Sequence, residues 1–118
     1  IAEQLISGLL EKKQQQSVSS VVRRYILQTV PGINLSLKST ARDLNMSDRT
    51  LQRKLLSENT SYQIILDDVR KELATKYLKE NISLVEISFL LGFETQSAFN
   101  KFFKKHFEKQ PSAFRKNN

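Results

Sequence analysis

The sequence predicts an all-α domain, and three observations support this prediction. Only three of its 118 residues are Gly and two are Pro, so the loops must be few and short. Apolar residues recur at the three- and four-residue spacing of amphipathic helices, and no segment shows the sustained alternation of a half-buried strand. Two stretches about 47 residues apart carry matching patterns, which indicates an internal repeat.

Residues 1–16 are predicted to be the remains of an interdomain linker, and residues 17–118 are predicted to form one domain. They carry a short apolar stripe of Ile1, Leu5 and Leu9 and then a polar run. A dimerising helix is the alternative, but the stripe is too short for several heptads. Because the chain opens in mid-pattern without a Met, we expect it to be a piece of a longer protein.

The first repeat unit is expected at about 36–57, after a helix over 18–29 that Pro31-Gly32 ends. Ser36 would cap a short helix over 37–44, which Asn45 ends because Asn tolerates the left-handed conformation. Ser47 would then cap the second helix of the unit, which carries residues 50–57.

A long helix over about 61–79 should link this unit to the second one. Roughly 19 residues at 1.5 Å each give a length of about 28 Å. One turn of B-DNA is about 34 Å long. A helix of this length could therefore hold two units one turn apart on one face of a duplex.

The second unit is expected at about 83–107. Ser83 would cap a helix over 84–91 that Gly92 ends, and Thr95 would cap a basic, aromatic-rich helix over 96–107. Pro111 suits the first position of a final short helix.

Each unit shows the residues that two steeply crossing helices need. A small residue stands where the helices cross, a residue that tolerates the left-handed conformation stands at the turn, and an apolar residue seals the corner. These positions are filled by Ala41, Asn45 and Met46 in the first unit and by Ser88, Gly92 and Phe93 in the second. The sequence therefore predicts two helix-turn-helix units.

The charge balance favours a polyanionic partner. The net charge is +7, and residues 96–118 hold six basic side chains and one acidic side chain. We expect double-stranded DNA. A helical protein-interaction module is the stronger alternative, and an RNA binder is disfavoured because A-form grooves do not admit a recognition helix.

Composition argues against an enzyme or a metal centre. The absence of Cys and the single His exclude disulfides, thiol chemistry and multi-His metal sites. The one adjacent carboxylate pair, Asp67-Asp68, diverges by about 100° on a helix and cannot converge on a substrate. We therefore expect no catalysis and no cofactor. No apolar run could span a bilayer, and we expect no membrane partner and a cytoplasmic location at the nucleoid.

Several stretches together resemble the AraC/XylS family of bacterial regulators, across nearly the whole domain. They are ISLVEIS at 82–88, LGF at 91–93, FNKFFKK at 99–105, PSAFR at 111–115 and MSDRTLQRKL at 46–55, with Arg70, Ala74 and Leu78 between them. The resemblance implies a seven-helix, homeodomain-like fold with two helix-turn-helix subdomains joined by a long linker helix. It also implies that the domain lies C-terminal to an effector-sensing or dimerisation domain, and that the full-length protein contacts RNA polymerase.

The chain departs from the family pattern at four positions. Thr40 replaces a usually apolar residue, Ser88 replaces a common Ala, and Asn59 and Glu108 stand where the family often has Gly. A left-handed conformation at Glu108 would cost on the order of 1 kcal/mol.

In the first unit, Leu51 and Leu55 should point inward and leave a polar face for DNA. Arg suits guanine and Gln suits adenine in the major groove. The candidate DNA-binding residues of this recognition helix are Ser47, Asp48, Arg49, Gln52 and Arg53. We expect them to carry most of the sequence discrimination; an ordinary solvated face is the alternative.

In the second unit, Phe99, Phe102 and Phe103 should form the buried stripe rather than stack on unpaired bases. The candidate DNA-binding residues are Thr95, Gln96, Ser97, Asn100, Lys101, Lys104 and Lys105. Lys104 and Lys105 suit phosphates, Thr95 suits a helix cap, and His106 is expected to face the surface or a phosphate. We expect this unit to anchor the backbone, and the fragment to bind as a monomer.

Overall fold

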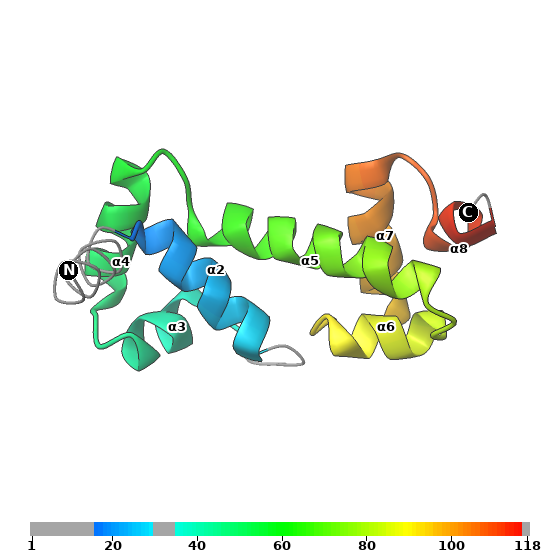
Figure 1. The fold of residues 1–118 in the computed structure, drawn as a ribbon, viewed down its shortest axis with the longest axis horizontal. Helices are drawn as coiled ribbons and strands as arrows, with labels where there is room; N and C mark the ends of the chain where they lie inside the picture. The colour runs from blue at the N-terminus through cyan, green and yellow to red at the C-terminus, as the bar shows by residue number, and fades with distance from the viewer. Residues whose placement is uncertain (1–15, 30–34, 117–118) are drawn as a thin grey trace, which may run out of the picture.

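The computed structural model describes residues 16–29 and 35–116, and in these ranges the chain is all-helical (Figure 1). The helices are α2 Val18–Thr29, α3 Leu37–Asp43, α4 Asp48–Ser57, α5 Tyr62–Lys79, α6 Leu84–Leu90, α7 Gln96–Phe107 and α8 Pro111–Lys116. The predicted all-α class, with two helix-turn-helix units joined by a long helix, is confirmed, and the described ranges hold seven helices.

The predicted helix bounds agree with the structure to within one residue at most ends. Leu44 and Leu91 are C-caps, whereas the sequence placed each of them in its helix. The second helix of the first unit begins at Asp48, as α4. The interpretation of 1–15 as linker and of Pro31-Gly32 as a helix stop falls outside the described residues.

Two hydrophobic cores lie at opposite ends of α5, which contributes to both. The first is built from α2 to α4 and the N-terminal half of α5, and the second from α6 to α8 and the C-terminal half of α5. Leu73, near the middle of α5, packs against both cores and is only partly buried. Figure 1 shows α4 and α7 separated by the length of this one helix.

The corners of the two units have the same backbone geometry. Asn45 and Gly92 both take a left-handed conformation, with φ of 59° and 84°. In each unit the amide of the next residue closes the corner. The Met46 amide donates to the Ala41 carbonyl at 2.8 Å, and the Phe93 amide donates to the Ser88 carbonyl at 3.0 Å. The repeat predicted from sequence is therefore a repeat of hydrogen bonding as well.

Buried polar residues in the cores have partners. The hydroxyl of Thr40 donates to the hydroxyl of Tyr62 at 2.8 Å, and the hydroxyl of Ser88 donates to the Leu84 carbonyl at 2.7 Å. Burial raises the pKa of Tyr62, so this phenol stays neutral at physiological pH. Thr40 and Ser88 thus depart from the family pattern without leaving a hydroxyl unsatisfied.

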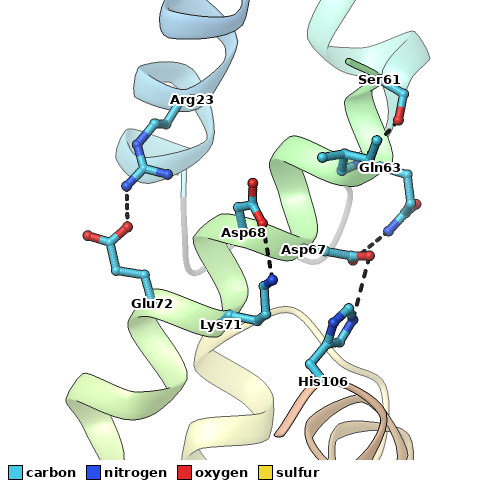
Figure 2. A network of polar contacts seen from close by, with 9 residues as sticks. Arg23, Ser61, Gln63, Asp67, Asp68, Lys71, Glu72 and His106 are labelled. Atoms are coloured by element: carbon cyan, nitrogen blue, oxygen red, sulfur yellow. Dashed lines mark hydrogen bonds and ion pairs between the residues drawn. The ribbon is translucent and has the colours of Figure 1, made fainter. Parts of the chain in front are cut away.

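Polar contacts from the middle of α5 reach both halves of the molecule. Figure 2 shows Arg23 of α2 paired with Glu72, and His106 of α7 facing Asp67 with 3.8 Å between Nε2 and Oδ2. The guanidinium of Arg70 donates to the carbonyl of Leu91 at 3.0 Å and lies 4.4 Å from the ring centre of Phe93.

The expectation for His106 was wrong. Its side chain is only 20% exposed, its ring lies 4.6 Å from that of Phe102, and it points at α5 rather than at solvent or a phosphate site. Asp67 lies on α5, far from His106 in the sequence, so the spacing of residues along α7 could not have predicted this contact. Asp68 turns away from Asp67 to pair with Lys71 at 3.2 Å, as expected for adjacent residues on a helix.

The N-terminus of α2 is capped by a carboxylate from the end of α4. The two oxygens of Glu58 accept the amides of Val18 and Ser19 at 2.8 and 3.0 Å. These bonds, chiefly the one from Ser19, lower the pKa of Glu58 below its ordinary value near 4.5. The cap stabilises the charged form and joins α2 to α4.

Glu108→Gly is expected to raise the free energy of unfolding by about 1 kcal/mol, because Glu108 has φ of 62° at the C-cap of α7. Urea denaturation would measure the change. Glu80→Gly is the matched control, since Glu80 is also a helix C-cap but has φ of −90°. It should lower stability by roughly 0.4–1 kcal/mol. Equal effects of the two changes would contradict the backbone explanation.

Glu58→Gln is expected to lower the free energy of unfolding at pH 7 by about 1 kcal/mol, because the amide side chain has one acceptor oxygen instead of two. The pKa of Glu58 is lower in the folded state, so its contribution is complete above about 4.5 and is lost as the pH falls through the folded-state value. The stability difference between wild type and variant should therefore shrink on acidification. A difference that stays constant from pH 7 to pH 3 would contradict this cap.

Candidate nucleic-acid interface

The recognition helix of the first unit, α4, presents its predicted residues on the outside. Ser47 caps the helix by accepting the Thr50 amide at 3.1 Å, and Asp48 lies exposed in the first turn. Leu51 and Leu55 are buried in the first core, as expected. Arg49, Gln52 and Arg53 are exposed as a result.

The exposed stripe of α4 includes one apolar residue that the sequence analysis missed. Leu56 follows Gln52 by four positions and Arg53 by three, and the residue is 73% exposed. Spacings of three, four and seven residues from Arg49 place all four side chains on one helix face. This spacing was visible in the sequence and could have included Leu56.

The recognition helix of the second unit, α7, is less uniformly exposed. Thr95 caps it by accepting the Ala98 amide at 3.0 Å. Phe99 and Phe103 are buried as expected, but the prediction that Phe102 is also buried was wrong, because it is partly exposed and packs beside Phe93. The exposed predicted residues are Thr95, Ser97, Lys101, Lys104 and Lys105.

Gln96 and Asn100, two of the candidate DNA-binding residues of this unit, are half-buried. The Oδ1 atom of Asn100 is shielded from solvent and accepts no hydrogen bond from the residues that the structure describes. A buried unpaired acceptor is costly. The side-chain amide group of Asn100 is therefore only partly available to a partner.

Two grooves lie at equivalent places in the two units. The first, with a volume of about 810 Å³, lies between the outer face of α4, the start of α3 and the start of α5. The second, of about 600 Å³, lies between α7, the start of α6 and the start of α8. The repeat therefore extends from the helices to the hollows beside their outer faces.

Most of the predicted DNA-binding residues line one of the two grooves. Arg49, Gln52 and Arg53 line the first groove. The second is lined by Gln96, Ser97, Asn100, Lys101 and Lys104. Ser47, Asp48, Thr95 and Lys105 do not line either groove. Residues that were not predicted also line the grooves, among them Leu56 in the first and Gln110 and Ser112 in the second.

The electrostatics of both grooves suit an anion. Arg49 and Arg53 line the first and Lys101 and Lys104 the second, and none of the described residues lining either groove is acidic. Among the described residues, no group of His, Asp and Glu side chains could hold a metal ion. Within the same ranges, no helix has the length and apolarity needed to cross a membrane.

Comparison with known proteins connects this geometry to a family of regulators. A family model described as a helix-turn-helix domain matches residues 40–117. The ornithine utilization regulator of Pseudomonas aeruginosa is 44% identical over 102 residues, which make up 86% of this chain and 30% of that protein. The chain thus spans less than a third of the length of this curated relative.

Solved structures show the same fold. The C-terminal domain of AraT, a response regulator from Geobacillus stearothermophilus, matches with a TM-score of 0.79 and 28% identity, over 87% of each chain. A DNA-binding transcriptional dual regulator from Escherichia coli K-12 matches with a TM-score of 0.81 over 87% of this chain and 93% of that one. At 23% identity the second likeness concerns the fold alone.

Gln52→Ala and Arg53→Ala are each expected to weaken binding to a preferred duplex by about 1–3 kcal/mol and to relax the preference at one or two base pairs. Titration of matched duplexes that differ at single pairs would measure this. Lys54→Ala is the control, because Lys54 is exposed on the same helix but does not line the groove. Equal weakening on every duplex would instead assign the residue to the DNA backbone.

Proposed function

Since the chain belongs to the AraC-type family of helix-turn-helix transcription regulators, we propose that it binds double-stranded DNA sequence-specifically, with α4 and α7 in adjacent major grooves. The family is one of transcription regulators, which is a non-enzymatic role. The observation that carries the proposal is the pair of equivalent grooves with basic linings, one at each end of α5.

The length of α5 supports simultaneous binding by both units. Its 18 residues give roughly 27 Å at 1.5 Å per residue, against about 34 Å for a turn of B-DNA. The hydrogen bond and ion pairs that join α5 to both halves favour a fixed spacing of the two recognition helices.

In the first unit, we assign base reading to the exposed polar stripe. Arg49 and Arg53 suit guanine O6 and N7, and Gln52 suits adenine N6 and N7. Ser47 and Asp48 lie at the N-terminal end of α4, the end from which recognition helices contact base edges.

In the second unit, the exposed lysines suit phosphate contacts. Lys101, Lys104 and Lys105 would hold the backbone, with Lys101 also able to reach guanine. Ser97 and the half-buried Gln96 and Asn100 would contribute base-edge contacts, and Thr95 would contribute at the N-terminus of α7. We infer that this unit anchors the domain and that the first unit discriminates sequence.

For the whole protein, we infer a longer bacterial regulator acting on DNA in the cytoplasm, at the nucleoid. Residues 17–118 would form its DNA-binding domain, and 1–16 the linker from an effector-sensing or dimerisation domain. Contact with RNA polymerase would follow from its role in transcription. The fragment alone should bind as a monomer.

Selection of bound duplexes from a random library with this purified fragment would test the proposed function. We expect a bipartite motif with its two elements about 10 base pairs apart, centre to centre, because the units are held by one rigid helix. A motif with one element would show that a single unit binds. Absence of any enriched sequence would overturn the proposal of sequence-specific binding.

A further inference from the structure

Leu56 is the one residue of the exposed α4 stripe that can neither donate nor accept a hydrogen bond. It lines the first groove together with Arg49, Gln52 and Arg53, and the residue is 73% exposed. A single exposed leucine is ordinary on a protein surface. Its place within the recognition stripe is what requires an explanation.

The internal repeat supplies the comparison. The buried Leu51 and Leu55 of α4 match the buried Phe99 and Phe103 of α7 at an offset of 48 residues. At this offset, Arg49 matches Ser97, Gln52 matches Asn100 and Arg53 matches Lys101. Leu56 matches Lys104, and both line the groove of their own unit. The two faces thus agree in chemical type at Gln52 and Arg53. They differ at Arg49, which matches a serine, and at Leu56, where the first unit is aliphatic and the second is cationic.

A leucine at this place has one suitable partner in the major groove. It cannot bind a phosphate or a base-edge donor or acceptor, because its side chain has no polar atom. The only apolar group that the major groove presents is the C5-methyl of thymine. Removing this methyl and the leucine from water together is favourable.

Resting on the proposed function, we propose that Leu56 contacts the C5-methyl of a thymine in the half-site bound by α4 and so determines specificity at that base pair. Leu56 lies four residues beyond Gln52, about 6 Å along the helix axis. Base pairs are stacked about 3.4 Å apart. The thymine therefore lies one or two base steps from the pair that Gln52 reads.

The two half-sites, which are the DNA segments bound by α4 and by α7, would then differ chemically. In the first, affinity depends on a thymine methyl. At the matched place in the second, Lys104 contacts phosphate or a base acceptor and is indifferent to the methyl. A duplex with both half-sites identical would then be bound less well than one that keeps this asymmetry.

The test replaces each thymine of a selected duplex by uracil, one at a time, which removes the methyl and leaves base pairing unchanged. With the wild-type fragment, one such replacement in the first half-site should weaken binding about fourfold, the value for one buried methyl group. With Leu56→Ala, the same replacement should have no more than a small effect. Ile64→Ala is the control, since Ile64 is also an exposed aliphatic residue of the first half but does not line the groove; it should keep the full fourfold loss.

A second variant tests the contrast between the units. Leu56→Lys places the residue of the second unit at the matched position of the first. It should abolish the uracil effect and make the slope of log K against log[salt] steeper by about one, as expected for one added phosphate contact.

The outcomes separate this inference from the proposed function. If no duplex is selected, the proposed function itself fails. If a duplex is selected and bound, but no uracil replacement weakens binding, or the weakening persists in Leu56→Ala, the role of Leu56 is overturned while DNA binding stands.

Discussion

The packing of α5 between two separate cores is the constraint on which the rest of the structure depends. Val69 in its N-terminal half and Ala74 in its C-terminal half are both fully buried, each in a different core. Each core takes some of its buried side chains from α5. The helix is therefore structural for both units, and its length separates their recognition helices.

Polar contacts add orientation to this hydrophobic packing. Arg70 binds the carbonyl at the end of α6 and covers Phe93, so it holds the corner of the second unit against α5. The Arg23–Glu72 and Asp67–His106 pairs hold α2 and α7 against α5 in the same way. Partly exposed pairs contribute little stability individually. Their geometric effect is to restrict rotation of each unit about the linker helix.

The two units show how a repeated backbone can carry different chemistry. The corner hydrogen bonds and the left-handed conformation at the turn are the same in both. The outer faces are not, because residues pointing at solvent are free to change without disturbing a core. The first face combines arginines, a glutamine and a leucine, and the second combines lysines with a half-buried asparagine. Such divergence suits a bipartite site whose halves have different sequences.

The sequence by itself determined the features that depend on neighbouring residues. Helix periodicity, the caps at Ser36, Ser47, Ser83 and Thr95, and the left-handed turns all follow from side chains within a few positions of one another, and the structure agrees with them. The inward leucines of α4 followed from the same periodicity, so the exposed face of the first unit could be predicted almost completely.

Only the tertiary structure decided the features that join distant segments. Glu58 caps a helix that begins 40 residues earlier, and His106 faces Asp67 on another helix. The shielding of Asn100 Oδ1 and the grooves beside α4 and α7 likewise depend on which helix ends come together. Local propensity carries no information about these contacts between distant segments, because they form only when α5 is buried in both cores at once.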